Sequence, residues 1–228
     1  MKKEYYIFKI KLKALNILAN VSFIVLFGII YLIFPNIIIK FFEYFDNVKF
    51  CILFLPITML YMALHEVLHA LGYLLYGANF KKITFGMELE KGVFYCLCKE
   101  DISRKNILNS VLFPLFYIGV LTLTIGIVFK LPLLVVLSLL NISGASADIM
   151  YFMFIVKLDK SIKFSELDDG TSFAILSDKD VSKVKHIGLE YVEKRSNIER
   201  NDLKKIKVSK LSYIVLILCL LLTIYCIL

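Results

Sequence analysis

Residues 65–77 read HEVLHALGYLLYG, a stretch in which two of the chain's three histidines flank a glutamate within an almost wholly apolar run. If this run is a helix, His65 and His69 lie one turn apart on the same face, because residues i and i+4 stack. Two imidazoles in that arrangement can bind one metal ion, and Glu66 beside them can act as a general base on a water molecule at the metal. The H-E-x-x-H spacing therefore predicts a zinc site with hydrolytic chemistry.

The chain around this motif is strongly apolar. Of its 228 residues 59% are hydrophobic, and the mean hydropathy is +0.78, whereas ordinary soluble domains are nearer half apolar. Apolar runs of about 20 residues are typical of membrane spans. We predict a mainly α, multi-pass transmembrane bundle of about five spans, and no cleaved signal peptide because the first run is too long. The five predicted spans are Ala14–Pro35, Phe50–Tyr76, Ile107–Phe129, Leu131–Val156 and Leu211–Leu228.

The net charge of +8 is distributed unevenly. Lysine and arginine concentrate before the first span, between spans two and three, and between spans four and five. Five spans place these three segments on one side, and an excess of basic residues marks the cytoplasmic side. We expect a cell-membrane protein with a cytoplasmic N-terminus and an outside C-terminus. The charge then serves contact with the lipid bilayer, and no nucleic-acid partner is expected.

The polar connections are short. After the second span, ITFGMEL and VFYCLC flank a turn-like EKG, which predicts a cytoplasmic β-hairpin over residues 80–99. In residues 157–210, FSELDDGTSFAIL predicts two short strands around Asp-Asp-Gly, and residues 181–210 have a helix-forming composition. We therefore expect a core at 1–156, a small cytoplasmic mixed α/β tail segment at 157–210, and a C-terminal transmembrane helix at 211–228. Cys96 and Cys98 lack the spacing of structural zinc sites.

A catalytic zinc needs a third protein ligand. His186, the only other histidine, lies in the charged tail segment and is expected to be a surface residue. Asp148 and Glu66 are the only acidic residues in the predicted spans, and intramembrane ionisable groups mark function by default. Asp148 and His69 both lie on the order of 10–12 Å from the same end of their spans, at 1.5 Å per residue. Asp148 is therefore the predicted third ligand.

Small and polar residues, NISGASA at 141–147, precede Asp148. Small residues let helices approach closely, and they tolerate a break where the backbone lines a cavity. Non-metal alternatives stay open for these groups. The histidines could be neutral and hydrogen-bonded inside a bundle, Asp148 could be protonated or bonded to serine, and Asn141 could serve interhelical hydrogen bonding alone.

HEVLHALGYLLYG, the hairpin after it, and an aspartate preceded by an asparagine late in a subsequent span resemble the site-2-protease group of intramembrane metalloproteases. More specifically, the chain resembles a bacterial family of zincin-type membrane metallopeptidases related to that group, over roughly residues 50–156. The resemblance implies that His65, His69 and Asp148 hold one Zn²⁺ per chain and that Glu66 activates water. It also implies a substrate-positioning role for Asn141.

We therefore expect a zinc-dependent metallopeptidase that hydrolyses a peptide bond of a membrane protein or peptide at or within the cytoplasmic side of the membrane. Two other classes compete with this hypothesis. One is an intramembrane metal or proton carrier, which needs polar groups in series through the membrane. The other is a catalytically inactive relative that binds membrane partners. Hydrolysis of a non-peptide bond also stays open, because zinc sites attack many carbonyls.

Overall fold

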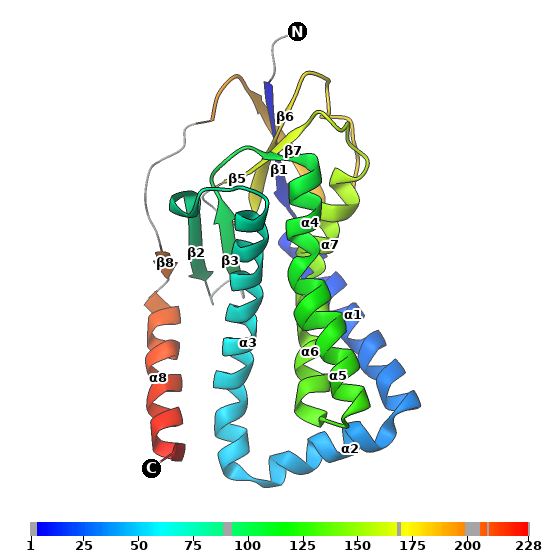
Figure 1. Ribbon diagram of the computed structural model, residues 1–228, viewed down its shortest axis with the longest axis vertical. Coiled ribbons are helices and arrows are strands. Elements are labelled where there is room, and N and C mark those ends of the chain that lie inside the picture. Colours follow the sequence, from blue (N-terminus) through cyan, green and yellow to red (C-terminus); the bar gives the residue numbers. More distant parts are fainter. Residues whose placement is uncertain (1–3, 89–92, 168–169, 199–205, 209, 228) are drawn as a thin grey trace.

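The computed structural model describes residues 4–88, 93–167, 170–198, 206–208 and 210–227. The chain is mainly helical, as predicted, with two small sheets gathered at one end of a helical bundle (Figure 1). The helices are α1 (Leu12–Ile33), α2 (Pro35–Glu43), η1 (Tyr44–Asp46), α3 (Val48–Leu75), η2 (Phe80–Lys82), α4 (Arg104–Pro114), η4 (Leu115–Leu121), α5 (Thr122–Val128), α6 (Pro132–Gly144), α7 (Ser146–Ile155) and α8 (Lys210–Ile227). The strands are β1 (Glu4–Ile10), β2 (Ile83–Glu88), β3 (Val93–Cys98), β4 (Ile102–Ser103), β5 (Lys163–Glu166), β6 (Ser172–Ser177), β7 (Leu189–Arg195) and β8 (Ile206–Val208).

Three helical stretches among the described residues are long and apolar enough to cross a membrane: α1, α3 and the α4–η4–α5 run over 104–128. The pair α6 and α7 is a fourth if it counts as one span, and it bends by 43° at Ala145. This bend falls within the small-residue run, where the sequence predicted that a break is tolerated. The apolar stretch in α8, Leu211–Leu221, is shorter than a membrane span requires. The fifth span therefore stays a prediction.

The helix that carries the H-E-x-x-H motif has defined ends. Asn47 caps α3 by accepting a hydrogen bond from the Lys49 backbone N–H at 2.9 Å, which satisfies one of the free donors of the first turn. At the other end Gly77 adopts φ +90, and the Ala78 N–H bonds back to the Tyr73 carbonyl at 3.0 Å. A glycine in this left-handed conformation commonly ends a helix, because residues with a Cβ disfavour a positive φ. The sheets follow directly after it.

The first sheet has the order β4-β5-β6-β1-β7 with antiparallel neighbours throughout. β1 was not predicted, because the N-terminal segment was interpreted only as a basic flank. Its side chain Phe8 packs against Phe173 of β6 at a ring distance of 5.6 Å and against Phe154 of α7 at 4.8 Å. All three rings are almost fully buried, and each such ring contributes about 1.5–3 kcal/mol of burial. The aromatic cluster therefore fixes α7 beneath this sheet.

The second sheet has the order β3-β2-β8, with β2 and β3 antiparallel and β8 parallel to β2. The β2–β3 pairing confirms the predicted hairpin, while its turn residues Glu90, Lys91 and Gly92 lie outside the described residues. β5 and β6 are the two strands predicted around Asp-Asp-Gly, of which Asp168 and Asp169 lie outside the described residues. Gly170 has φ +66.

The predicted helix over residues 181–210 is wrong in its described part. Residues 181–188 form turns and loop, 189–195 form β7, and 206–208 form β8. β7 gains a partner in β1, with Ile10 opposite Leu189 and Tyr5 opposite Arg195. Backbone pairing with a distant strand overrides a local helix preference that is worth only a few tenths of a kcal/mol per residue.

Candidate metal centre

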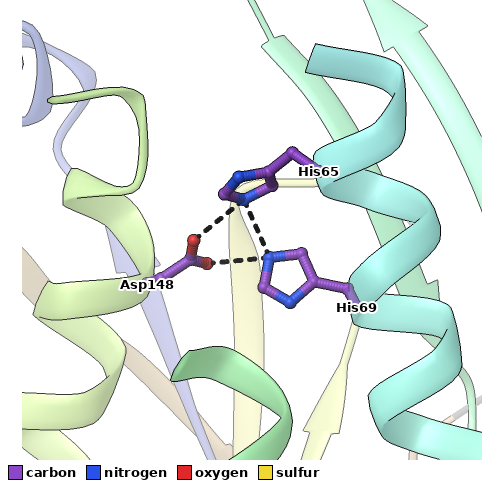
Figure 2. A group of neighbouring side chains, drawn as sticks. All are labelled: His65, His69 and Asp148. Atoms are coloured by element: carbon purple, nitrogen blue, oxygen red, sulfur yellow. Dashed lines mark hydrogen bonds and ion pairs between the residues drawn. The ribbon is translucent and has the colours of Figure 1, made fainter. Parts of the chain in front are cut away.

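Three side chains from two helices converge at the level where the bundle meets the sheets (Figure 2). His65 and His69 project from α3, and Asp148 projects from the first turn of α7. The two Nε2 atoms lie 3.1 Å apart, and the Asp148 carboxylate oxygens lie 3.1 Å from His65 Nε2 and 3.3 Å from His69 Nε2. All three residues are buried. The structure thus brings together the three predicted metal ligands, here named the His–His–Asp group.

The spacing within this group fits a zinc ion. Bonds of 2.0–2.1 Å at tetrahedral angles separate neighbouring ligand atoms by roughly 3.3 Å. The measured separations of 3.1, 3.1 and 3.3 Å lie close to that value. Two imidazoles and one carboxylate leave a fourth tetrahedral position, which is the ligand set of catalytic rather than closed structural zinc sites. The donor set therefore suits a zinc ion that must also bind water or substrate.

The far nitrogen of each imidazole is also engaged. His69 Nδ1 lies 3.1 Å from the Ser110 carbonyl oxygen on α4, and His65 Nδ1 lies 2.9 Å from the Asn141 amide nitrogen on α6. Such outer contacts orient ligating histidines and select their tautomers. A backbone carbonyl can only accept, so Ser110 holds His69 with its proton on Nδ1 and its lone pair on Nε2.

Glu66 lines the same cavity as the His–His–Asp group without belonging to it. Its carboxylate accepts a hydrogen bond from the Cys96 backbone N–H on β3. The cavity has a volume of about 100 Å³, which accommodates a metal ion and a few water molecules. Its walls come from α3, α7, β3 and the β5–β6 region, so it lies where the helices meet the sheets.

Glu166 on β5 is a cavity residue that the sequence reasoning missed. It accepts hydrogen bonds from the Tyr73 hydroxyl at 3.2 Å and from the Cys98 backbone N–H at 2.6 Å. Burial raises the pKa of this carboxyl to about 7. Tyr73 stands one turn after His69 on the same face of α3, so Glu166 ties the motif helix to the first sheet. In the sequence Glu166 is one of many charged residues in the tail segment, and no local pattern indicates that it reaches the cavity.

A polar cluster inside the bundle was also missed. The Tyr61 hydroxyl donates to the Ile118 carbonyl at 2.6 Å and lies 2.7 Å from the Thr122 hydroxyl, which lies 2.8 Å from Ser138 Oγ. We call Tyr61, Thr122 and Ser138 the hydroxyl clamp. It joins α3, α5 and α6 one turn away from His65 and Asn141, and so holds those residues in register.

Two further predictions can be placed. His186 is partly buried against the Phe154 ring, with ring centres 6.3 Å apart, and is not part of the His–His–Asp group. Cys96 and Cys98 are buried on β3, and burial raises the pKa of the Cys96 thiol. Cys96 lines the cavity, and the backbone N–H groups of Cys96 and Cys98 bind Glu66 and Glu166.

A sequence profile of the family described as "Putative zincin peptidase" matches residues 58–163. The matched region contains His65, Glu66, His69, Asn141 and Asp148, and it ends before Glu166. No curated protein and no solved structure matches the chain. Together with the close approach of His65, His69 and Asp148, the match supports a zincin-type metallopeptidase family, and zinc as the metal that this site would hold.

Proposed function

We propose that the chain is a zinc-dependent membrane metallopeptidase of the site-2-protease type, which hydrolyses a peptide bond of a membrane protein or peptide. The observation that carries this proposal is the convergence of His65, His69 and Asp148 around one point, with the Glu66 carboxylate in the same cavity. The position of that cavity, between membrane-type helices and two sheets, suits a substrate at the edge of the bilayer.

In the proposed mechanism His65, His69 and Asp148 hold the metal. A bound zinc would polarise the scissile carbonyl and make a water molecule acidic. Glu66 takes a proton from the attacking water as the water oxygen bonds to the carbonyl carbon. Glu66 then passes that proton to the leaving nitrogen as the C–N bond breaks. The Cys96 N–H positions the Glu66 carboxylate for both transfers, and the surrounding apolar side chains limit access of bulk water.

We further propose that the end of the bundle with the sheets faces the cytoplasm and that α8 forms the fifth span. β1 and the described part of residues 157–198 lie at that end, and β2 starts there beside the end of α3 (Figure 1). An excess of lysine and arginine favours the cytoplasmic side. The proposed substrate would then be cleaved near the inner membrane surface.

The test uses Glu66→Gln, which preserves shape and removes the base. The purified chain in detergent is incubated with zinc and a library of labelled single-span peptides, and cleavage is read by mass spectrometry. The wild type should cut, while Glu66→Gln should bind zinc equally well and lose roughly 10²-fold or more in rate. Glu43→Gln, at the end of the bundle remote from the cavity, is the matched control. Cleavage by Glu66→Gln at the wild-type rate would reject the mechanism.

The same experiment separates the competing classes. An inactive relative would bind zinc and cut none of the peptides in any variant. A carrier would move zinc into liposomes, which a zinc-sensitive dye inside them reports. The only acidic residues in the described spans are Glu66 and Asp148, both in one cavity, whereas a transport path needs ionisable groups in series. The structure therefore offers more support for the peptidase.

A further inference from the structure

Asn141 occupies a fully buried position on α6. Its amide nitrogen lies 2.9 Å from His65 Nδ1. Its amide oxygen is buried and has no hydrogen-bond partner among the described residues. An unsatisfied buried acceptor costs about 1–3 kcal/mol. One half of this side chain therefore contacts a metal-ligating histidine, while the other half has an unmet hydrogen-bonding capacity.

The present orientation of the amide matches only one tautomer of His65. An amide nitrogen donates, so it requires a lone pair on Nδ1 and leaves the imidazole proton on Nε2, facing Asp148 Oδ2 at 3.1 Å. A zinc ligand needs the opposite arrangement, because a metal takes the Nε2 lone pair and the proton then resides on Nδ1. Two N–H donors would then face each other unless Asn141 presents its oxygen.

His69 has no such freedom, because the Ser110 backbone carbonyl next to its Nδ1 can only accept. A rotation of 180° about the last side-chain bond would give His65 the equivalent arrangement, with the Asn141 oxygen at the site now held by the nitrogen. The neighbouring Gly119 leaves room for this rotation, because glycine has no Cβ. Gly119 of η4 faces Asn141, and a Cβ there would come within 3.4 Å of the amide oxygen.

The hydroxyl clamp keeps the two partners opposite each other. Ser138 precedes Asn141 by three residues on α6, and Tyr61 precedes His65 by four residues on α3. Hydroxyls and amides that bond across helices fix the register of membrane bundles. The approach of Asn141 to His65 thus follows from the way the bundle packs.

We propose that Asn141 is the positioning residue of His65, whose amide oxygen accepts the Nδ1 proton and thereby presents Nε2 to the metal. This inference rests on the zinc site of the proposed function. It gives Asn141 a role different from the substrate-positioning role that the resemblance implies, because a fully buried side chain bonded to His65 does not line the cavity.

The test combines zinc affinity with the tautomer of His65. The chain has only three histidines, so ¹⁵N-histidine labelling of the detergent-solubilised protein gives a readable spectrum. In the zinc-loaded wild type, His65 should show a protonated, slowly exchanging Nδ1 and a ligated Nε2. Loss of the outer acceptor in Asn141→Leu should weaken zinc binding about 10–100-fold, measured by competition with a chelator. That variant should also speed exchange of the Nδ1 proton.

Asn141→Asp restores an acceptor and should keep zinc affinity within about threefold of the wild type or strengthen it. Ser143→Ala is the matched control, since it removes a buried hydroxyl on α6 that donates to the Leu139 carbonyl at 2.8 Å, and it should leave zinc affinity unchanged. If Asn141 had only a structural role, both variants would fold less well, and Asn141→Asp would not keep the zinc affinity of the wild type.

Each outcome decides the point. Equal zinc affinity in the wild type and Asn141→Leu would overturn the inference alone, as would a zinc-loaded wild type in which Nδ1 of His65 carries no proton. Ligation of Nε2 alone puts a proton on Nδ1, whereas only an acceptor such as the Asn141 oxygen holds that proton in a hydrogen bond. Rapid solvent exchange of the Nδ1 proton in the zinc-loaded wild type would therefore overturn the inference even if Asn141→Leu does not fold. A folded wild type that binds no zinc would overturn the proposed function and this inference together.

Discussion

The Asp148 carboxylate lies 3.1 Å from Nε2 of His65, although 83 positions separate the two residues in the chain. Two separate sets of contacts hold α7 in the position that brings Asp148 to His65. The Phe154 ring packs into the aromatic core of the first sheet, and Arg104 at the start of α4 donates to the Ile155 and Val156 carbonyls at the end of α7. A cation at a helix C-terminus satisfies free carbonyls and the helix dipole.

A first prediction concerns the close approach of α3 to α4. A Cβ on Gly72 would lie 3.1 Å from the Ser110 Cα, so Gly72→Ala must push apart the two helices that hold His69 and its Ser110 acceptor. We expect a loss of about 1–3 kcal/mol in stability and a weaker zinc affinity. Thermal unfolding in detergent and chelator competition measure both quantities.

Gly28→Ala is the matched control, because nothing lies within 4 Å of a Cβ at that position of α1. It should be neutral, or stabilising by up to about 1 kcal/mol through helix propensity. Equal behaviour of the two variants would contradict the proposed role of the Gly72 contact.

A second prediction concerns pH. Burial raises the pKa of Glu166 in the folded chain to about 7 from an ordinary value of 4.5. A raised carboxyl pKa stabilises the fold fully below pH 4.5, and that stability is lost as the pH rises through 7. Relative to Glu166→Gln, the wild type should therefore lose at most about 3 kcal/mol over this interval.

Thermal unfolding midpoints of both proteins between pH 4.5 and 8 measure this difference. Glu190→Gln, which removes an exposed carboxylate from β7, corrects for the loss of one charge. A difference between wild type and Glu166→Gln that stays constant with pH would contradict the assignment.

A third prediction concerns the hydroxyl clamp. Tyr61→Phe removes the hydroxyl that joins the Ile118 carbonyl to Thr122, and should cost about 0.5–1.5 kcal/mol. The Thr122–Ser138 contact at 2.8 Å remains, but it joins only α5 and α6, so His65 on α3 is held less firmly opposite Asn141 and zinc affinity should weaken. An unchanged zinc affinity in a variant that has lost stability would contradict the role of the hydroxyl clamp in holding this register.

Much of the site could be predicted because its signals are local or energetic. The i, i+4 spacing of His65 and His69 is readable from helix periodicity, and Asp148 stands out because a carboxylate in an apolar span is costly. The break at Ala145 follows from the small residues around it. Each of these inferences needs only a few consecutive residues and one physical rule.

The rest depends on contacts between distant segments. β1 becomes a strand because β6 and β7, more than 160 positions later, pair with both of its edges. The same pairing makes a strand of a segment with helix-forming composition. The contacts of Ser110 with His69 and of Glu166 with Tyr73 arise only when separate helices and strands pack, so no local pattern indicates them.

The most direct test of the central claim is the zinc content of the detergent-purified wild type, His69→Ala and Asp148→Ala, measured by elemental mass spectrometry. The structure predicts about one zinc per wild-type chain, and a large loss of zinc from both variants, since each removes one of three protein ligands. A well-folded wild type without zinc, or an Asp148→Ala variant with undiminished zinc, would contradict the account.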